Sequence, residues 1–178
     1  MYKLDEVLLS KNQGINTTTE KVKYTDHGYK IVQAKDIQKY GFTFDKKNFV
    51  DKDTFSRIKD LHKLKKGDLL FSNIGSQLGN ACIYDLDEEA IITWNVMKLT
   101  PDPEKVDAAY LCSWLNWKSE EIKALNSSST MPFVSGKVLG KVDIELPNLQ
   151  EQEKIASIIY DINEKIKNNT HINNNLVA

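Results

Sequence analysis

The sequence predicts a mixed α+β fold: a globular domain over residues 1–148 followed by one long helix over residues 149–178. Several short segments alternate apolar and polar residues at the period of a β-strand, whereas residues 107–125 carry apolar side chains at the 3.6-residue period of a helix. Residues 151–176 contain no glycine or proline, the two residues that weaken helices most. We therefore expect a mixed β-sheet with short helices, and a long C-terminal helix outside it.

The expected elements follow the chain in order. Residues 4–9 are expected to form an amphipathic turn or short helix, and strands are expected at 29–34, 68–72, 81–84, 90–99 and 142–146. Residues 11–20 are polar and lack periodicity, which predicts an exposed loop. Residues 36–66 are charged with isolated aromatic residues, which predicts loops and short helices. Asp107 is placed to cap the helix at 107–125.

Composition places the chain among ordinary globular proteins. Of its 178 residues, 40% are apolar and 28% charged, which excludes a disordered or disulfide-stapled chain. No apolar run reaches the roughly 18 residues of a membrane helix, and the acidic start differs from a secretory leader, so a cytoplasmic protein is expected. Cys82 and Cys112 lie in apolar stretches and are expected to be reduced core residues.

The net charge of −1 hides an uneven distribution. Residues 1–70 hold 15 basic and 10 acidic residues, whereas residues 71–178 hold 9 and 15. A positive N-terminal half is able to follow a phosphate backbone. Almost all of the basic residues are lysine, and 15 asparagines accompany them, which is typical of biased genomic base composition. Scattered solvated charge therefore remains an alternative interpretation.

The C-terminal segment has the spacing of a helix that pairs with another helix. Ile155, Ile159, Ile162 and Ile166 recur at intervals of 4, 3 and 4 residues, as in a heptad seam. The 26 residues of 151–176 would extend about 39 Å as a helix, farther than a compact domain easily covers. We expect a coiled coil, with packing along the chain's own domain as the alternative.

Residues that could support catalysis are few. Asp102, Glu121 and Lys123 fit the linear spacing of a metal-dependent nuclease site, but Glu121 and Lys123 fall in a helical pattern instead of on strands. None of the histidines has a second metal ligand three or four residues away: His27, His62 and His171. The sequence therefore predicts no catalytic centre, no metal site and no cofactor.

A binding loop is the better-supported feature. Lys65 and Lys66 precede an expected strand, and a loop with glycines at 75 and 79 follows it. Such a loop brings backbone N–H groups and polar side chains close to a phosphate or a base edge. A plain hairpin turn is the alternative.

Two segments carry a family resemblance. The segment Gly67-Asp-Leu-Leu-Phe-Ser-Asn-Ile-Gly-Ser76 resembles a segment of the specificity subunits of type I restriction-modification systems. The segment Val142-Asp-Ile-Glu-Leu-Pro-Asn-Leu-Gln-Glu-Gln-Glu-Lys-Ile155 is similar to that family's strand, its Leu-Pro-Pro-Leu-x-Glu-Gln corner and the following helix. Asn148 replaces the usual second proline of the corner, and Asn73 stands where the family often has arginine.

The resemblance implies a function. Family members usually carry two target-recognition domains and two long helices, so a chain with one of each looks like half a subunit, natural or truncated. The domain at 1–148 would recognise one half of a bipartite sequence in double-stranded DNA. The helix at 149–178 would set the distance to the second half and hold the methyltransferase subunits, which bind the methyl donor and modify adenine. A restriction subunit is a further partner, and the chain itself would not be an enzyme.

Within that interpretation, candidate residues fall into three groups. Contacts with the phosphate backbone are expected from Lys21, Lys23, Lys46, Lys47, Lys65 and Lys66. Contacts with bases or the adjacent backbone are expected from Thr17, Thr18, Thr19, Ser72, Asn73, Ser76 and Gln77. The heptad isoleucines would pair with an antiparallel second copy or with the second half of the same subunit. The competing hypothesis is a protein-interaction module that docks by its helix and touches no nucleic acid.

Overall fold

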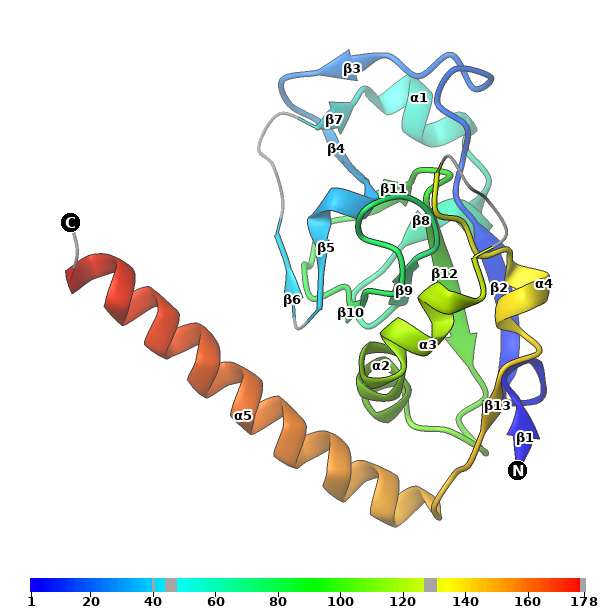
Figure 1. Ribbon diagram of the computed structural model, residues 1–178. Helices are drawn as coiled ribbons and strands as arrows, with labels where there is room; N and C mark the ends of the chain where they lie inside the picture. The colour runs from blue at the N-terminus through cyan, green and yellow to red at the C-terminus, as the bar shows by residue number, and fades with distance from the viewer. Residues whose placement is uncertain (40, 44–47, 127–130, 177–178) are drawn as a thin grey trace.

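The computed structural model describes residues 1–39, 41–43, 48–126 and 131–176. Over these residues the chain forms a globular part built on two β-sheets, and one long helix that leaves it (Figure 1). The predicted mixed α+β class and the long C-terminal helix are therefore confirmed. No helix among the described residues is long and apolar enough to cross a membrane.

Two sheets form the frame of the domain. The first has the order β10-β9-β12-β2 and is antiparallel throughout, with β10 at Ala81–Ile83, β9 at Leu69–Ser72, β12 at Val96–Pro101 and β2 at Leu8–Gln13. The second has the order β3-β7-β4-β11-β8, with β3 at Tyr24–Thr25, β7 at Phe49–Val50, β4 at Tyr29–Val32, β11 at Ala90–Ile92 and β8 at Lys63–Leu64. In the second sheet β4 and β11 are parallel, which makes the fold mixed.

Smaller elements complete the domain. Two short strand pairs join β1 at Tyr2–Lys3 to β13 at Asp143–Ile144, and β5 at Ile37–Gln38 to β6 at Gly41–Phe42. The 3-10 helices are η1 at Leu4–Val7, η2 at Ala34–Asp36 and η3 at Asp60–His62. The α-helices are α1 at Lys52–Arg57, α2 at Ala108–Trp117, α3 at Ser119–Ala124, α4 at Gly136–Leu139 and α5 at Leu149–Leu176.

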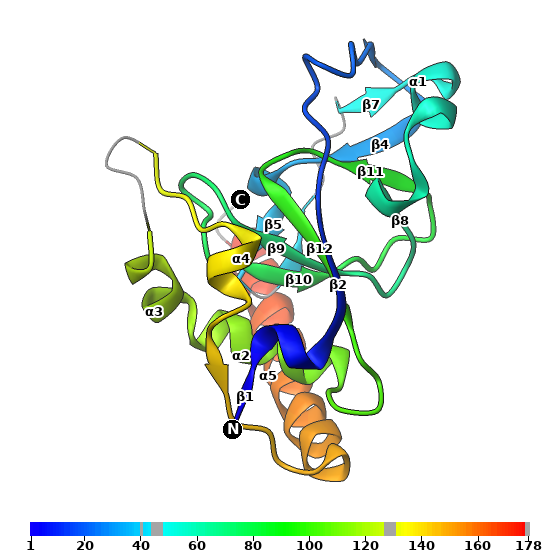
Figure 2. The same cartoon turned by 90° about the vertical axis from the view of Figure 1, so that its right-hand side faces the viewer.

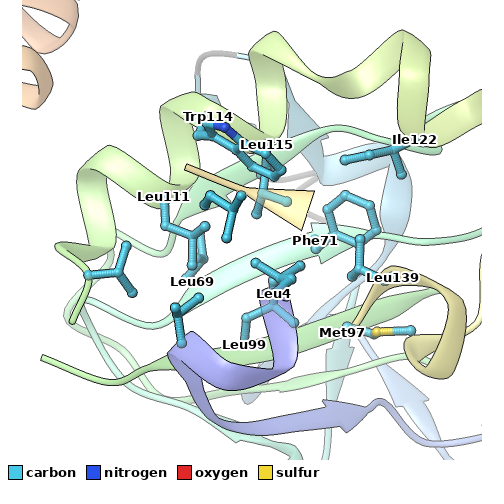
Figure 3. Packing of buried hydrophobic residues seen from close by; sticks show 14 of the residues in the cluster. Leu4, Leu69, Phe71, Met97, Leu99, Leu111, Trp114, Leu115, Ile122 and Leu139 are labelled. Atoms are coloured by element: carbon cyan, nitrogen blue, oxygen red, sulfur yellow. The ribbon is translucent and has the colours of Figure 1, made fainter. Parts of the chain in front are cut away.

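The core is divided by β9, whose side chains alternate between two apolar clusters. Leu69 and Phe71 pack with Leu111 and Leu115 of α2, in the larger cluster (Figure 3). Leu70 points the other way, into the cluster that the two sheets share. Because successive side chains of a strand face opposite sides, a strand covered on both faces reads as a continuous apolar run. The sequence Leu-Leu-Phe at 69–71 has this property.

Most predicted elements are found close to their predicted positions. β4, β9, β10 and β13 lie within the expected strands, and η1 lies within residues 4–9. The Asp107 carboxylate accepts a hydrogen bond from the Tyr110 backbone N–H at 2.8 Å, so the predicted cap of α2 is confirmed. The helix expected at 107–125 is divided at Lys118 into α2 and α3.

Three expectations were wrong. Residues 36–66, expected to form loops and short helices, also contain the short strands β5, β6, β7 and β8. The single strand expected at 90–99 is β11 and β12, which belong to different sheets and are separated by a turn at residues 93–95. The loop expected at 11–20 begins as the second half of β2, a polar edge strand that pairs with β12. Residues 11–13 are all polar and no residue of β2 is fully buried, so no alternation of apolar and polar side chains indicated a strand there.

Both cysteines are free thiols. Cys82 is buried and Cys112 is half-buried, and burial raises the pKa of Cys112 to about 12. A thiol with a raised pKa is a poor nucleophile, because the thiolate is the reactive form. The prediction of reduced core cysteines is confirmed.

The corner between the domain and α5 is fixed by one buried side chain. Gln152 is 1% exposed. Its Oε1 accepts from the backbone N–H of Asp107 at 3.0 Å, and its Nε2 donates to the carbonyls of Lys105 at 3.1 Å and Pro147 at 2.9 Å. Asn148 accepts from the backbone N–H of Glu151 at 3.0 Å and so caps α5, which explains why asparagine is suited to this position. The first turn of α5 is therefore fixed against the start of α2.

Candidate nucleic-acid interface

Three turns from distant parts of the sequence meet at one end of the first sheet, where its strands begin or finish. Since β12 is antiparallel to both β2 and β9, the ends of β2 and β9 lie beside the start of β12 (Figure 2). The backbone N–H of Trp94 donates to the carbonyl of Ile15 at 2.8 Å, and the backbone N–H of Asn73 donates to Asn95 at 3.4 Å. We call residues 13–21, 73–80 and 93–95 the loop edge.

A buried amide holds the loop edge together. The Asn73 Nδ2 donates to Gln13 Oε1 at 3.1 Å and to the carbonyl of Val134 at 3.3 Å. The Gln13 Nε2 in turn donates to Asn73 Oδ1 at 3.0 Å. This pair joins the end of β2, the end of β9 and the segment before α4. Asn73 therefore positions the loops around it.

The burial of Ser72 and Asn73 corrects part of the sequence interpretation. Both side chains are 0% exposed, and a direct contact with a base requires atoms that the base can reach. We therefore exclude Ser72 and Asn73 from the set of base-contacting candidates. Of the remaining loop residues, Ser76 is exposed, while Gln77 is half-buried and accepts a hydrogen bond from Asn80 Nδ2 at 2.7 Å.

The threonine-rich segment after β2 is an ordered turn with exposed side chains. Asn16 Oδ1 accepts from the backbone N–H groups of Thr18 at 3.0 Å and Thr19 at 3.1 Å. The Lys21 carbonyl accepts from Arg57 Nη2 of α1 at 3.1 Å. Lys21 has a φ of 47°, in the left-handed region that a non-glycine residue seldom occupies. Thr18, Thr19 and Lys21 are exposed, and Thr17 is half-buried.

The candidate lysines do not all lie together. Lys21 is the last residue of the first loop-edge segment, Lys23 follows it two residues later, and both are exposed. Lys65 and Lys66 precede β9 and so lie at the opposite end of that strand from residues 73–80. Lys66 is paired with Asp87 at 2.7 Å, and this pairing raises the pKa of Lys66. The remaining two candidates, Lys46 and Lys47, lie outside the described residues.

The three residues of the nuclease alternative do not form a site. Each is paired elsewhere: Asp102 with Lys105 at 3.1 Å, Glu121 with Lys118 at 2.7 Å, and Lys123 with Glu120 at 2.8 Å. Within the described part of the chain, no group of three or more His, Cys, Asp or Glu side chains could hold a metal ion. The geometry gives this alternative no support.

Sequence reasoning missed one residue of the loop edge. Trp94 is 47% exposed although it follows three fully buried strand residues, Ala90–Ile92. The sequence interpretation placed it inside the strand at 90–99. The polar residues on both sides of it, Thr93 and Asn95, are the local signal of a turn.

Comparison with known proteins gives a family. The family model for the type I restriction modification DNA specificity domain matches residues 1–178, the domain and the helix together. The specificity subunit of the type I restriction enzyme HindI from Haemophilus influenzae is 29% identical over 131 residues, covering 68% of this chain and 28% of the relative. The MjaVIII specificity subunit from Methanocaldococcus jannaschii is 24% identical over 150 residues, covering 81% and 35%.

Solved structures agree in fold. A chain of a type I R-M system superposes with a TM-score of 0.70 at 20% identity, covering 96% of this chain and 40% of that one. The type I S subunit from M. genitalium gives 0.66 at 20% identity, covering 93% and 39%. This chain thus spans well under half the length of these relatives. It belongs to the family of type I restriction-modification DNA specificity domains.

Proposed function

We propose that the domain recognises one half of a bipartite DNA target, and that α5 sets its distance from the second half. The observation that carries the proposal is the family match over both the domain and the helix. The loop edge adds chemical support, because most of its exposed side chains carry hydroxyl, amide or ammonium groups, which suit base edges and phosphates. The target DNA duplex would lie across the loop edge.

The same proposal gives the chain its place in a larger enzyme. The chain would supply recognition only, and methyltransferase subunits would bind the methyl donor and modify adenine. A restriction subunit would be a further partner, and the assembly would act in the cytoplasm. The raised pKa values of the two thiols and the separately paired carboxylates Asp102 and Glu121 are consistent with a non-catalytic role.

The proposed role of α5 rests on apolar side chains that its own domain leaves uncovered. Of the side chains described on α5, Gln152 and Ala156 are buried, and both lie in its first turns. Farther along, Ile162 is 51% and Ile166 53% exposed. Large apolar groups that recur at heptad spacing and face solvent favour a helical partner. We propose that this partner is an antiparallel second copy or the second half of the same subunit.

The function is tested with the assembled complex of this chain and its methyltransferase subunit. A duplex that carries the sequence methylated by the complex is expected to bind at least about 1,000-fold more tightly than a scrambled duplex. Equal binding of the two duplexes would contradict sequence recognition. It would favour the protein-interaction module, which assembles without preference for DNA sequence.

The phosphate contacts give a prediction about salt. Replacing Lys21 and Lys23 together by alanine is expected to weaken binding to both duplexes, because each lost phosphate contact flattens the slope of log affinity against log salt by about one unit. The slope should therefore fall by about two units in a titration of binding at several salt concentrations.

Replacing Lys65 and Lys66 by alanine is the matched control, since it removes the same charge from the opposite end of β9. Their double replacement should leave the slope unchanged if the duplex lies at the loop edge. A flattened slope in the Lys65 and Lys66 variant, with none at Lys21 and Lys23, would place the duplex at the other end of the strand.

A further inference from the structure

Trp94 lies where the chain passes from one sheet to the other. It occupies the turn between β11, in the five-stranded sheet, and β12, in the four-stranded sheet. Thr93 before it is buried and donates from Oγ1 to the carbonyl of Val32 at 3.0 Å. Trp94 is nevertheless 47% exposed. Tryptophan is usually buried over most of its surface, because it loses the most when its large apolar area stays in water.

The backbone under this side chain is fixed from several directions. The Trp94 N–H donates to Ile15 at 2.8 Å, and its carbonyl accepts from the Gln13 side chain. Gly14 passes so close that an added Cβ would lie 2.2 Å from the Thr93 carbonyl oxygen and 2.5 Å from that of Ile92. Only glycine permits this approach. An exposed aromatic ring on a fixed backbone loses little conformational freedom when it binds a partner.

The surroundings of Trp94 indicate the chemistry of that partner. Trp94 belongs to the loop edge, whose other exposed residues include Thr18, Lys21 and Ser76. These groups hydrogen-bond with base edges or attract phosphate, so they suit a duplex better than an apolar protein surface. In a DNA groove, one apolar side chain among polar ones contacts the thymine methyl group or the face of a base.

We propose that Trp94 is a specificity-determining residue that packs its indole against a base of the recognised half-site. The inference rests on the proposed function and adds to it the apolar component of recognition. An apolar contact releases no counterion from the duplex, so it changes affinity for the correct sequence without changing the salt dependence. In this respect Trp94 differs from Lys21 and Lys23.

The test compares Trp94→Ala with Trp117→Ala in the assembled complex with the methyltransferase subunit. Trp117 is 72% exposed but lines a separate groove with Trp114 and Leu125. Its replacement therefore removes the same indole ring from a different surface of the domain. The Trp94 variant is expected to bind the duplex that carries the complex's own methylation sequence roughly tenfold more weakly than the wild type does. Its binding to a scrambled duplex should change little, and the slope of log affinity against log salt should be unchanged. The Trp117 variant should bind as the wild type does.

Two further variants keep the test decisive if Trp94→Ala does not assemble. Trp94→Phe keeps an aromatic ring and should retain most of the preference, whereas Trp94→Gln replaces the ring with a smaller polar side chain and should lose it. The inference would be overturned if Trp94→Gln still discriminated between the two duplexes as the wild type does. It would also be overturned if the variants lost assembly with the methyltransferase subunit while the complexes that did assemble discriminated normally. If the wild-type complex itself shows no sequence preference, the proposed function fails, which is a separate result.

Discussion

Replacing Ile162 by aspartate is expected to convert the proposed helix-paired form of this chain into monomers. Ile162 is 51% exposed in the single chain and lies at the centre of the heptad seam. Pairing would bury the introduced carboxylate without a partner, at a cost of about 3 kcal/mol or more. A cost of that size weakens association by at least about 100-fold. Sedimentation of the wild type and the variant at equal concentration measures this change directly.

The control places the same charge on another side of α5. Asn168 is exposed and lies off the seam, so Asn168→Asp should leave the sedimenting mass unchanged. If Ile162→Asp also sediments with the wild-type mass, the seam does not hold the partner. If both variants dissociate, net charge and not burial controls the association.

The second large effect is expected at the corner between the domain and α5. Gln152→Ala removes three hydrogen bonds and leaves the Asp107 N–H and the Lys105 and Pro147 carbonyls without their partner. Leaving buried polar groups unsatisfied costs about 1–3 kcal/mol each at most, and water entering the gap reduces the sum, so we expect a loss of roughly 3 kcal/mol. For a chain of this size, that loss lowers the melting temperature by about 6–12 °C.

Gln150→Ala is the matched control for this experiment. Gln150 belongs to the same helical turn but is exposed, so its loss should change the melting temperature by less than about 2 °C. Similar melting temperatures for the Gln152 variant and the wild type would mean that the corner is not held by this side chain. Because the corner fixes the direction of α5, the Gln152 variant should also relax the spacing between half-sites that the assembled enzyme accepts.

Periodicity predicted the elements whose local pattern matches their burial. The alternation at β4 and the 3.6-residue period of α2 are local properties, and both elements form where expected. The change of sheet at residues 93–95 was not predictable in this way. An apolar pattern reports that β11 and β12 are both buried, but it does not report that Ile92 and Val96 belong to different sheets.

The loop edge was only partly predictable, because it depends on contacts between residues far apart in sequence. Asn73 has the side chain that reads adenine in many DNA complexes, yet Gln13, 60 residues away, binds it inside the domain. The Thr17–Thr19 candidates lie at the loop edge because β2 pairs with β12, which in turn pairs with β9, and the polar sequence of β2 did not indicate this pairing. Residue type identified candidates, and only the fold showed which of them face outward.

The most direct test of the central claim is to map methylated adenines in an assembled enzyme whose domain at residues 1–148 has been exchanged for that of another family member. Recognition by this domain predicts that one half of the methylated sequence changes while the other half and the spacing stay the same. Methylation of the original sequence after the exchange would contradict it, because the choice of bases would then come from another subunit.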